Sequence, residues 1–244
     1  MPAVPIGSSA PTLAVERHLP HDTSRFTQGL VRVRDELVET TGLVGESTLI
    51  VMDLQGRTKR SVKLPAQVFG EGVAVDPALD GGTVWVLTWK DKRILRYTWP
   101  GLSAKADLPL DTQGWGACLH DGMLWTSDGT STISARDPKT GAVHHRIQVT
   151  TRAGVPVTML NELECNPDGT IWSNVWMTNQ IVRISTVSGQ VSAVVDAAAL
   201  TAEASKHRRL GPDDVLNGIA TMPDGSLLLT GKRWPLMFVA RVSG

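Results

Sequence analysis

The 244-residue chain contains little cysteine, one Tyr and three Phe, and it has no excess of charge of either sign. Its 24 basic residues balance 24 acidic ones. This balance argues against a protein that binds nucleic acid or an anionic membrane, because such proteins usually carry a basic excess. No run approaches the about 18 continuous apolar residues of a membrane span. Two cysteines cannot form a cysteine-rich zinc site.

The first residues lack a leader with a charged and then an apolar part, and residues 1–11 read as a loose tail. If a leader has been removed ahead of this tail, the protein acts outside the cytoplasm. The two cysteines leave the compartment open. Cys118 and Cys165 lie in neighbouring repeats and could pair, but their spacing does not require a disulfide.

A five-residue segment recurs along the chain, at 26–30, 69–73, 113–117, 159–163 and 215–219. The successive intervals are 43, 44, 46 and 56 residues. Within each repeat, short apolar strands alternate with Asp/Gly turns such as Pro167-Asp168-Gly169. Short strands with a period of about 40 to 50 residues are typical of propeller blades that have four strands each.

The fifth repeat ends after its third strand, near residues 239–242, and residues 12–17 can supply the missing fourth strand. Pairing of the two chain ends would close the ring and remove exposed strand edges. The long last interval contains residues 197–210, whose Ala, Leu, Glu and Lys content predicts a short helical insertion. We therefore predict an all-β fold, a five-bladed β-propeller that forms a single domain over residues 1–244. A two-sheet sandwich is the alternative.

In a propeller, equivalent positions of the innermost strands meet in a ring around the axis. The central residues of the five segments form the first ring: Gln28, Glu71, Trp115, Asn161 and Asn217. The ends of the second strands form another: Thr41, Trp89, Asp128, Trp176 and Lys232. Any one of these residues could simply cap a strand or fill a wedge between blades. Three indoles around a few convergent polar groups, however, are typical of a ligand pocket.

Glu71 is the only carboxylate in the first ring. Indoles around a carboxylate raise its pKa through poor solvation, whereas a nearby lysine lowers it, so Glu71 is a candidate general acid and base. A glycosidase pair with Asp128 has less support, because Asp128 belongs to the other ring.

Other catalytic groups have weaker support. Ser127 has no histidine partner in the repeat pattern and is predicted to lie in a turn. The six histidines form no spaced ligand motif. His144 and His145 are neighbours in a predicted strand and should point to opposite faces.

Several segments resemble, in order, the motifs of the plant and bacterial glutaminyl cyclases, which are the glutamine cyclotransferases of the papaya type. The resemblance extends from about Arg25 to Phe238. It includes Phe26-Thr27-Gln28-Gly29-Leu30, Phe69-Gly70-Glu71-Gly72, Leu87-Thr88-Trp89, Gly114-Trp115-Gly116, Ser127-Asp128-Gly129-Thr130, Leu160-Asn161-Glu162-Leu163-Glu164, Asn174-Val175-Trp176, Leu216-Asn217-Gly218-Ile219-Ala220 and Thr230-Gly231-Lys232-Arg233-Trp234-Pro235. The animal glutaminyl cyclases belong to a different, zinc-dependent class with an α/β fold.

The resemblance implies that the N-terminal glutamine of a peptide attacks its own side-chain amide, forming pyroglutamate and releasing ammonia. It implies that Glu71 relays the proton and that Asn161 and Lys232 bind the γ-carbonyl. Gln28 and Asn217 would orient the substrate. The expected pocket walls are Phe26, Phe69, Trp89, Trp115 and Trp176.

We expect a monomer that uses no metal or other cofactor. The resemblance implies that its partners are peptides or proteins with an N-terminal glutamine. Two other interpretations remain. One is a propeller that binds a peptide at its mouth without reacting with it. The other is a lactonase-like propeller with a metal in its central channel.

Overall fold

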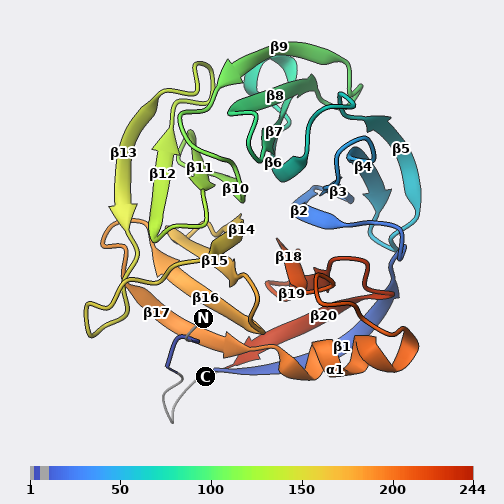
Figure 1. Cartoon of the computed structure of the whole chain (residues 1–244), viewed down its shortest axis with the longest axis vertical. Coiled ribbons are helices and arrows are strands. Elements are labelled where there is room, and N and C mark those ends of the chain that lie inside the picture. The colour runs from blue at the N-terminus through green and yellow to red at the C-terminus, as the bar shows by residue number, and fades with distance from the viewer. Residues whose placement is uncertain (1–2, 6–10, 244) are drawn as a thin grey trace.

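The computed structural model describes residues 3–5 and 11–243. Five antiparallel sheets of four strands each stand around one axis, as Figure 1 shows. In four of the sheets the chain runs from the strand nearest the axis outward, and in the fifth the outermost strand is β1 (Thr12–Pro20) from the start of the chain. This arrangement confirms the prediction of a five-bladed β-propeller and excludes the sandwich.

The blades are numbered from the N-terminus. Blade one holds β2 (Thr27–Val33), β3 (Glu36–Thr41), β4 (Thr48–Asp53) and β5 (Thr58–Lys63). Blade two holds β6 (Gly70–Asp76), β7 (Thr83–Thr88), β8 (Arg93–Thr98) and β9 (Ala104–Pro109). Blade three holds β10 (Ala117–His120), β11 (Met123–Ser127), β12 (Thr132–Arg136) and β13 (Val143–Gln148). Blade four holds β14 (Leu160–Cys165), β15 (Thr170–Val175), β16 (Gln180–Ser185) and β17 (Val191–Asp196). Blade five holds β18 (Leu216–Thr221), β19 (Leu227–Gly231), β20 (Leu236–Ser243) and β1 (Thr12–Pro20).

Pairing of the two ends of the chain closes the ring. Strand β1 pairs antiparallel with β20, with Thr12 opposite Ser243 and Pro20 opposite Leu236. The predicted closing strand at 12–17 is therefore confirmed, and it continues for three more residues. Residues 1–2 and 6–10 of the predicted tail lie outside the described residues.

The predicted helical insertion is confirmed as α1 (Ala198–His207), which follows β17 at the outer edge of the ring in Figure 1. Leu200 and Ala204 lie one turn apart and are buried against blades four and five. No helix within the described ranges has the length and apolar character needed to span a bilayer.

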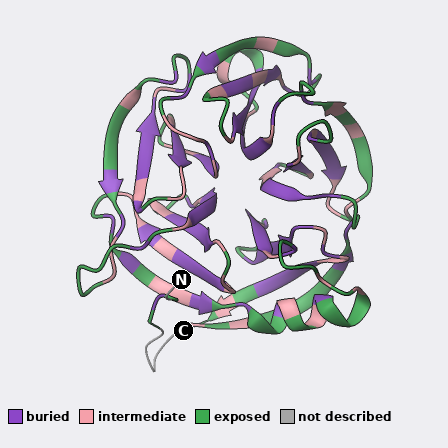
Figure 2. Ribbon diagram, in the orientation of Figure 1, coloured by how far each residue is buried: buried purple, intermediate pink, exposed green. Residues whose placement is uncertain are grey.

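Burial falls from the axis to the rim of each blade (Figure 2). Every residue of β7 is buried, whereas four of the six residues of β9 are exposed. An inner strand packs against other blades on both faces, but an outer strand has one face in water.

The hydrogen-bonded ladder between the first and second strands is interrupted at the same place in four blades. The register shifts fall between Thr27 and Gly29, Gly70 and Val73, Leu160 and Leu163, and Leu216 and Ile219. Such β-bulges leave a residue unpaired and turn its side chain in a new direction. The bulges contain four residues of the first ring: Gln28, Glu71, Asn161 and Asn217. The irregular backbone at the bulges therefore sets the direction in which these side chains point.

The inner strands of neighbouring blades approach so closely that glycine is required between them. A Cβ added to Gly72 would lie 2.5 Å from the backbone N of Ala117, and one added to Gly116 would lie 2.1 Å from the carbonyl O of Asn161. In blade four the corresponding residue is Glu162, whose carboxylate accepts a hydrogen bond from the backbone N–H of Leu30 at 3.3 Å. The channel beneath the first ring is thus closely packed.

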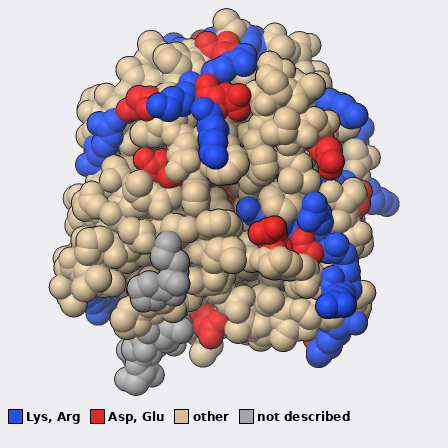
Figure 3. Space-filling model, in the orientation of Figure 1, with Lys and Arg blue, Asp and Glu red and all other residues tan. Residues whose placement is uncertain are grey.

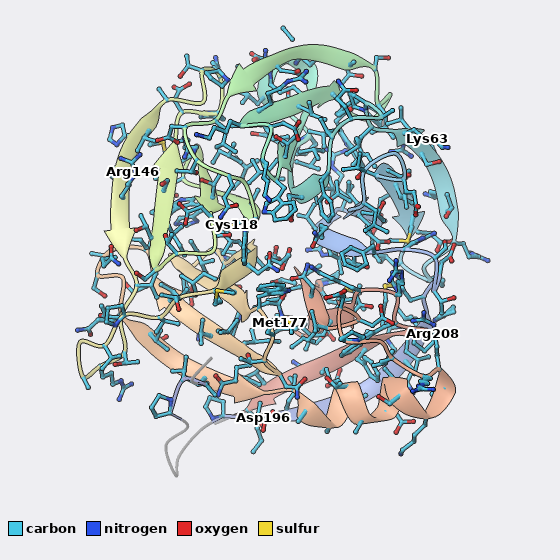
Figure 4. The ribbon with its side chains drawn as sticks, viewed as in Figure 1. Lys63, Cys118, Arg146, Met177, Asp196 and Arg208 are labelled. Atoms are coloured by element: carbon cyan, nitrogen blue, oxygen red, sulfur yellow. A yellow bond between two sulfur atoms is a disulfide. The ribbon has the colours of Figure 1, made fainter. Side chains whose placement is uncertain are left out.

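A disulfide joins Cys118 of β10 to Cys165 of β14, which answers the question that the sequence left open. Cys118 is labelled in Figure 4. The bond clamps together the inner strands of blades three and four, immediately beyond the segments that carry Trp115 and Asn161.

The prediction that His144 and His145 point to opposite faces is wrong. Their ring centroids are 5.6 Å apart. Ala135 pairs with His145 and Arg136 pairs with Val143, so His144 is the extra residue of a β-bulge. The bulge breaks the alternation on which the prediction was based.

Candidate active site

A cavity of about 310 Å³ opens at the end of the propeller where the inner strands begin. Its wall consists of Phe26, Gln28, Leu43, Phe69, Glu71, Trp89, Trp115, Asn161, Trp176, Asp213 and Lys232. Nine of the ten predicted site residues are in this set, and all five blades contribute to it. Ligand pockets usually measure about 300–1,000 Å³, so this one suits a single residue of a chain.

A larger hollow of about 790 Å³ lies at the opposite ends of β14 and β18. Its charged lining residues Arg32, Asp168 and Arg183 are exposed or half-buried. The smaller cavity instead contains two ionisable side chains, Glu71 and Lys232, that are each only 5% exposed. Because buried ionisable groups in a cleft mark functional sites, the smaller cavity is the candidate active site.

Aromatic rings form a nearly continuous wall around this cavity. Phe69 packs edge to face against Phe26 and Trp89, with centroid distances of 6.3 and 5.5 Å. Trp115 and Trp176 make the same kind of contact at 5.4 Å on the other side. Edge-to-face packing fixes the orientation of each ring and gives the cavity a rigid apolar lining.

Loop residues beside the second strands help to place these rings. A Cβ added to Gly129 would lie 2.6 Å from the indole of Trp115, so the absence of a side chain there makes room for the ring.

Met177, which follows Trp176, is 48% exposed and lies near the central opening in Figure 4, whereas Lys63 and Arg146 lie on the outermost strands. The molecular surface is hollowed at this opening, with basic and acidic side chains beside it (Figure 3).

Glu71 projects from the bulge at the start of β6, and its position is held through the backbone. Its carbonyl O accepts a hydrogen bond of 2.5 Å from the hydroxyl of Thr40. No described residue donates a hydrogen bond to its carboxylate. Burial raises the pKa of Glu71 well above its ordinary value, and the positive charge of Lys232 opposes this increase.

Lys232 enters the cavity from the end of β19. Its ammonium nitrogen lies 4.8 Å from the ring centroid of Phe26 and 6.0 Å from that of Trp176, so it bridges the two halves of the aromatic wall. Burial lowers the pKa of Lys232, while the negative charges of Glu71 and Asp213 oppose this decrease.

Asn161 contributes a side-chain amide to the cavity wall, and an amide of this kind can donate a hydrogen bond to an oxyanion. It is 3% exposed, and its Oδ1 is buried without a hydrogen bond to any described residue. A buried acceptor without a partner is costly, which favours a ligand group that donates a hydrogen bond to Asn161 Oδ1. Gln28 is likewise 3% exposed on the same wall.

Comparison with known sequences places this arrangement in context. A sequence profile described as glutamine cyclotransferase matches residues 5–242. A glutaminyl-peptide cyclotransferase from Arabidopsis thaliana is 34% identical over 230 residues, which are 93% of this chain and 70% of that protein. The chain belongs to the glutamine cyclotransferase family.

Solved structures agree with membership of this family. The crystal structure of Myxococcus xanthus glutaminyl cyclase superposes with a TM-score of 0.86 at 33% identity, covering 96% of this chain and 97% of that one. Kuenenia stuttgartiensis hydrazine synthase matches with a TM-score of 0.51 at 14% identity, covering 85% of this chain and 56% of that one. The second match shows only a shared fold.

Asn217, one of the ten predicted site residues, does not line the cavity. Its side chain is fully buried, and its Nδ2 donates to the carbonyl oxygens of Thr27 and Gln28 at 3.0 and 3.1 Å. In this structure Asn217 supports the cavity wall from beneath and is not part of it. Asn217 holds the backbone of the strand that carries Gln28.

Thr41 and Asp128 of the second ring are not on the wall either. Asp128 closes a turn by accepting hydrogen bonds from the backbone N–H and the hydroxyl of Thr130. Ser127 is the last residue of β11 and not part of the predicted turn, and its buried hydroxyl donates to the carbonyl O of Asn161 at 2.6 Å. A glycosidase pair formed by Glu71 and Asp128 therefore lacks its second member.

The sequence reasoning missed a buried charged network next to the site. Glu39 accepts hydrogen bonds from Arg25 at 3.0 Å and Thr27 at 2.7 Å, and its Oε1 lies 3.1 Å from His21 Nε2. Burial would raise the pKa of Glu39, but the charges of His21 and Arg25 lower it overall. The network fixes the segment that leads into Phe26 and Gln28.

Two further wall residues, Leu43 and Asp213, were also missed. Both lie in loops outside the recurring segments, so the repeat pattern does not point to them.

In the described ranges no three His, Cys, Asp or Glu side chains lie close enough together to hold a metal ion.

Proposed function

We propose that this chain is a glutaminyl-peptide cyclotransferase that converts the N-terminal glutamine of a peptide into pyroglutamate and releases ammonia. Family membership and the names of its relatives support the reaction class. The observation that carries the mechanism is the placing of Glu71 and Lys232 in one aromatic cavity without a direct ion pair between them. The carboxylate and the ammonium both remain available to a substrate.

In the proposed reaction, the α-amino nitrogen of the peptide attacks the side-chain carbonyl carbon of its own N-terminal glutamine. One C–N bond forms and closes the ring, and the bond to the side-chain amide nitrogen breaks. Glu71 takes a proton from the attacking nitrogen and delivers it to the departing nitrogen, which leaves as ammonia. A carboxyl group whose pKa is raised by burial can act as both base and acid in this way.

Negative charge develops on the carbonyl oxygen during the attack. Asn161 and Lys232 are the wall residues that can stabilise it, through an amide N–H and an ammonium group. Each is held before the substrate arrives, Asn161 by its place at the bulge of β14 and Lys232 by a backbone hydrogen bond of 2.9 Å to Val215. Donors fixed in advance stabilise a developing oxyanion more effectively than mobile ones do.

The aromatic wall has a separate role in this proposal. The reaction is intramolecular, so its rate depends on how often the flexible glutamine side chain folds back toward its own amine. Rings packed edge to face leave a narrow space that favours the folded form. Gln28 adds a polar group that can orient the substrate amide, and the backbone beneath it is held by Asn217.

The test is incubation of the protein with a short peptide that begins with glutamine. Mass spectrometry should show the loss of one ammonia, and an enzymatic assay should detect the ammonia released. The same peptide with an acetylated N-terminus has no nucleophile and should remain unchanged. If the unblocked peptide is bound but not altered, the proposal fails and the peptide-binding alternative stands.

A further inference from the structure

The loop between α1 and β18 carries two adjacent aspartates with different surroundings. Asp214 is buried, and its carboxylate accepts hydrogen bonds from Arg208 at 3.0 Å, Arg233 at 3.4 Å and the backbone N–H of Gly211 at 2.9 Å. Its carbonyl O also accepts a hydrogen bond from the indole of Trp234 at 2.8 Å. Asp214 therefore anchors the loop.

Asp213 is held next to this anchor but takes no part in it. Its side chain is exposed and lines the cavity, and it has no hydrogen bond or ion pair to any of the residues that the structure describes. The long last interval of the sequence, which contains α1, thus ends by presenting an unpaired carboxylate at the cavity wall. Neither the loop anchor nor the proposed chemistry uses this carboxylate.

Asp213 determines the sign of the net formal charge on the cavity wall. Glu71, Lys232 and Asp213 are the only charged residues among those that line the cavity. When Glu71 is ionised, it and Lys232 cancel, and Asp213 leaves a net charge of one negative unit. Two nearby cations do not line the cavity: Lys90 stacks on Trp89 at 4.0 Å, and Arg233 is paired with Asp214 and stacks on Phe26 at 4.9 Å.

We propose that Asp213 is a substrate-binding residue that recognises the positive charge of the peptide N-terminus. The inference rests on the proposed function, whose substrates carry a free α-amino group with a pKa of about 7.7–8.0 and are therefore largely protonated at neutral pH. With Glu71 ionised the cavity wall is net negative and attracts this ammonium group.

The same charge distinguishes substrate from product. Ring closure turns the α-amine into a lactam nitrogen, which carries no positive charge. The product therefore loses the group that Asp213 attracts, while its apolar contacts with the wall remain. Asp213 should strengthen substrate binding without strengthening product binding to the same degree, which limits inhibition by the product.

The test compares the wild-type protein with Asp213→Asn and with a control, Asp91→Asn. Asp91 is an exposed aspartate in the turn after Trp89, outside the cavity wall, and its substitution changes the net charge equally. Calorimetry measures the Kd of two peptides that cannot react. One begins with asparagine, which keeps the ammonium group but has a side chain too short to form the same ring, and the other begins with pyroglutamate.

We expect Asp213→Asn to weaken binding of the asparagine peptide by about two- to fivefold, the range of a partly exposed ion pair. Binding of the pyroglutamyl peptide should be unchanged, and Asp91→Asn should alter neither Kd. In Asp213→Asn, the KM for a glutamine peptide should rise by the same factor as the Kd of the asparagine peptide, while kcat stays the same. A thermal unfolding scan should show that Asp213→Asn is folded, because its side chain has no partner to lose.

Three results would overturn the inference: equal weakening of both peptides, an equal effect of Asp91→Asn, or a fall in kcat with both Kd values unchanged. The last result would mean that Asp213 acts through Lys232. Failure of the proposed function would look different, because the wild-type protein would then release no ammonia from a glutamine peptide. The Kd comparison does not depend on turnover.

Discussion

Glu71 and Lys232 are buried in the wall of one cavity and shift each other's pKa, yet they form no direct ion pair. A contact pair would neutralise both groups and occupy their hydrogen-bonding capacity. In the proposed mechanism, this separation keeps the carboxylate free to carry a proton and the ammonium free to stabilise an oxyanion. The acid–base group and the electrostatic group would then come from two different blades.

Glu71→Gln should remove turnover while preserving the fold. The amide has nearly the same shape but cannot carry a proton, so we expect kcat for a glutamine peptide to fall by about a hundredfold to ten-thousandfold. Steady-state ammonia release measures the change. Glu46→Gln alters an exposed glutamate in the neighbouring loop and should leave kcat unchanged. Equal rates for Glu71→Gln and the wild-type protein would exclude proton transfer by Glu71.

Lys232→Met should change the pH profile as well as the rate. The positive charge of Lys232 lowers the pKa of Glu71, so its removal raises that pKa further. Glu71 must be ionised to act as a base, and the acidic limb of kcat/KM should therefore move to higher pH. Lys232→Arg keeps the charge and should shift the limb less. A limb that stays in place in Lys232→Met would show that another group sets it.

Treatment with a chelator should leave ammonia release unchanged. Glu71 is the only buried carboxylate on the wall, and the ammonium of Lys232 repels a cation placed beside it. Hard cations require several oxygen ligands, which this donor set does not supply. The assay compares protein treated with chelator and desalted against untreated protein. Loss of activity that added zinc restores would favour the metal-containing alternative.

The repeat pattern was sufficient to predict the fold and most of the candidate site. Positions that recur once per blade must meet around the axis, so Gln28, Glu71 and Asn161 could be grouped without a structure. The direction of a side chain could not be predicted in the same way. Asn217 occupies the same place in its repeat, but its amide points to the backbone of a neighbouring strand. A β-bulge sets this direction, and the spacing of residues does not predict the geometry of a bulge.

Residues outside the repeats could not be found in this way. Asp213 lies in the insertion between blades four and five, and its role depends on the anchor that Asp214 makes with Arg208. The pairing of Cys118 with Cys165 depends on the closeness of two inner strands, and a sequence spacing of 47 residues does not reveal that distance. These features follow from contacts between blades rather than from any local pattern.

Removing the disulfide should destabilise the protein without abolishing its chemistry. The bond closes a segment with a sequence separation of 47, and cross-links of this kind contribute about 2–4 kcal/mol by restricting the unfolded chain. We expect Cys118→Ser with Cys165→Ser to lower the free energy of unfolding by that amount in urea titrations. Near 25 °C kcat should be close to that of the wild-type protein, because neither sulfur lies on the cavity wall. A large loss of kcat in folded protein would instead show that the bond positions Asn161.

Glu164 should make the stability of the protein fall as the pH rises. It is 7% exposed, and its Oε1 accepts a hydrogen bond of 2.7 Å from the backbone N–H of Thr221. Burial raises the pKa of Glu164 to about 7 from an ordinary value of 4.5, against the opposing effects of Thr221 and Arg32. Below its ordinary pKa the group is protonated in both the folded and unfolded states.

As the pH rises from about 4.5 through 7, the unfolded chain ionises first, and the folded state loses up to about 3 kcal/mol relative to it. In Glu164→Gln the amide oxygen can still accept the hydrogen bond from Thr221, but residue 164 no longer titrates. Urea titrations should therefore find this variant close to the wild-type protein at low pH and more stable at pH values above 7. Glu46→Gln serves again as the exposed control and should follow the wild-type curve. A constant difference between Glu164→Gln and the wild-type protein across this range would mean that Glu164 has the same pKa in the folded and unfolded states, and that its burial does not shift that pKa.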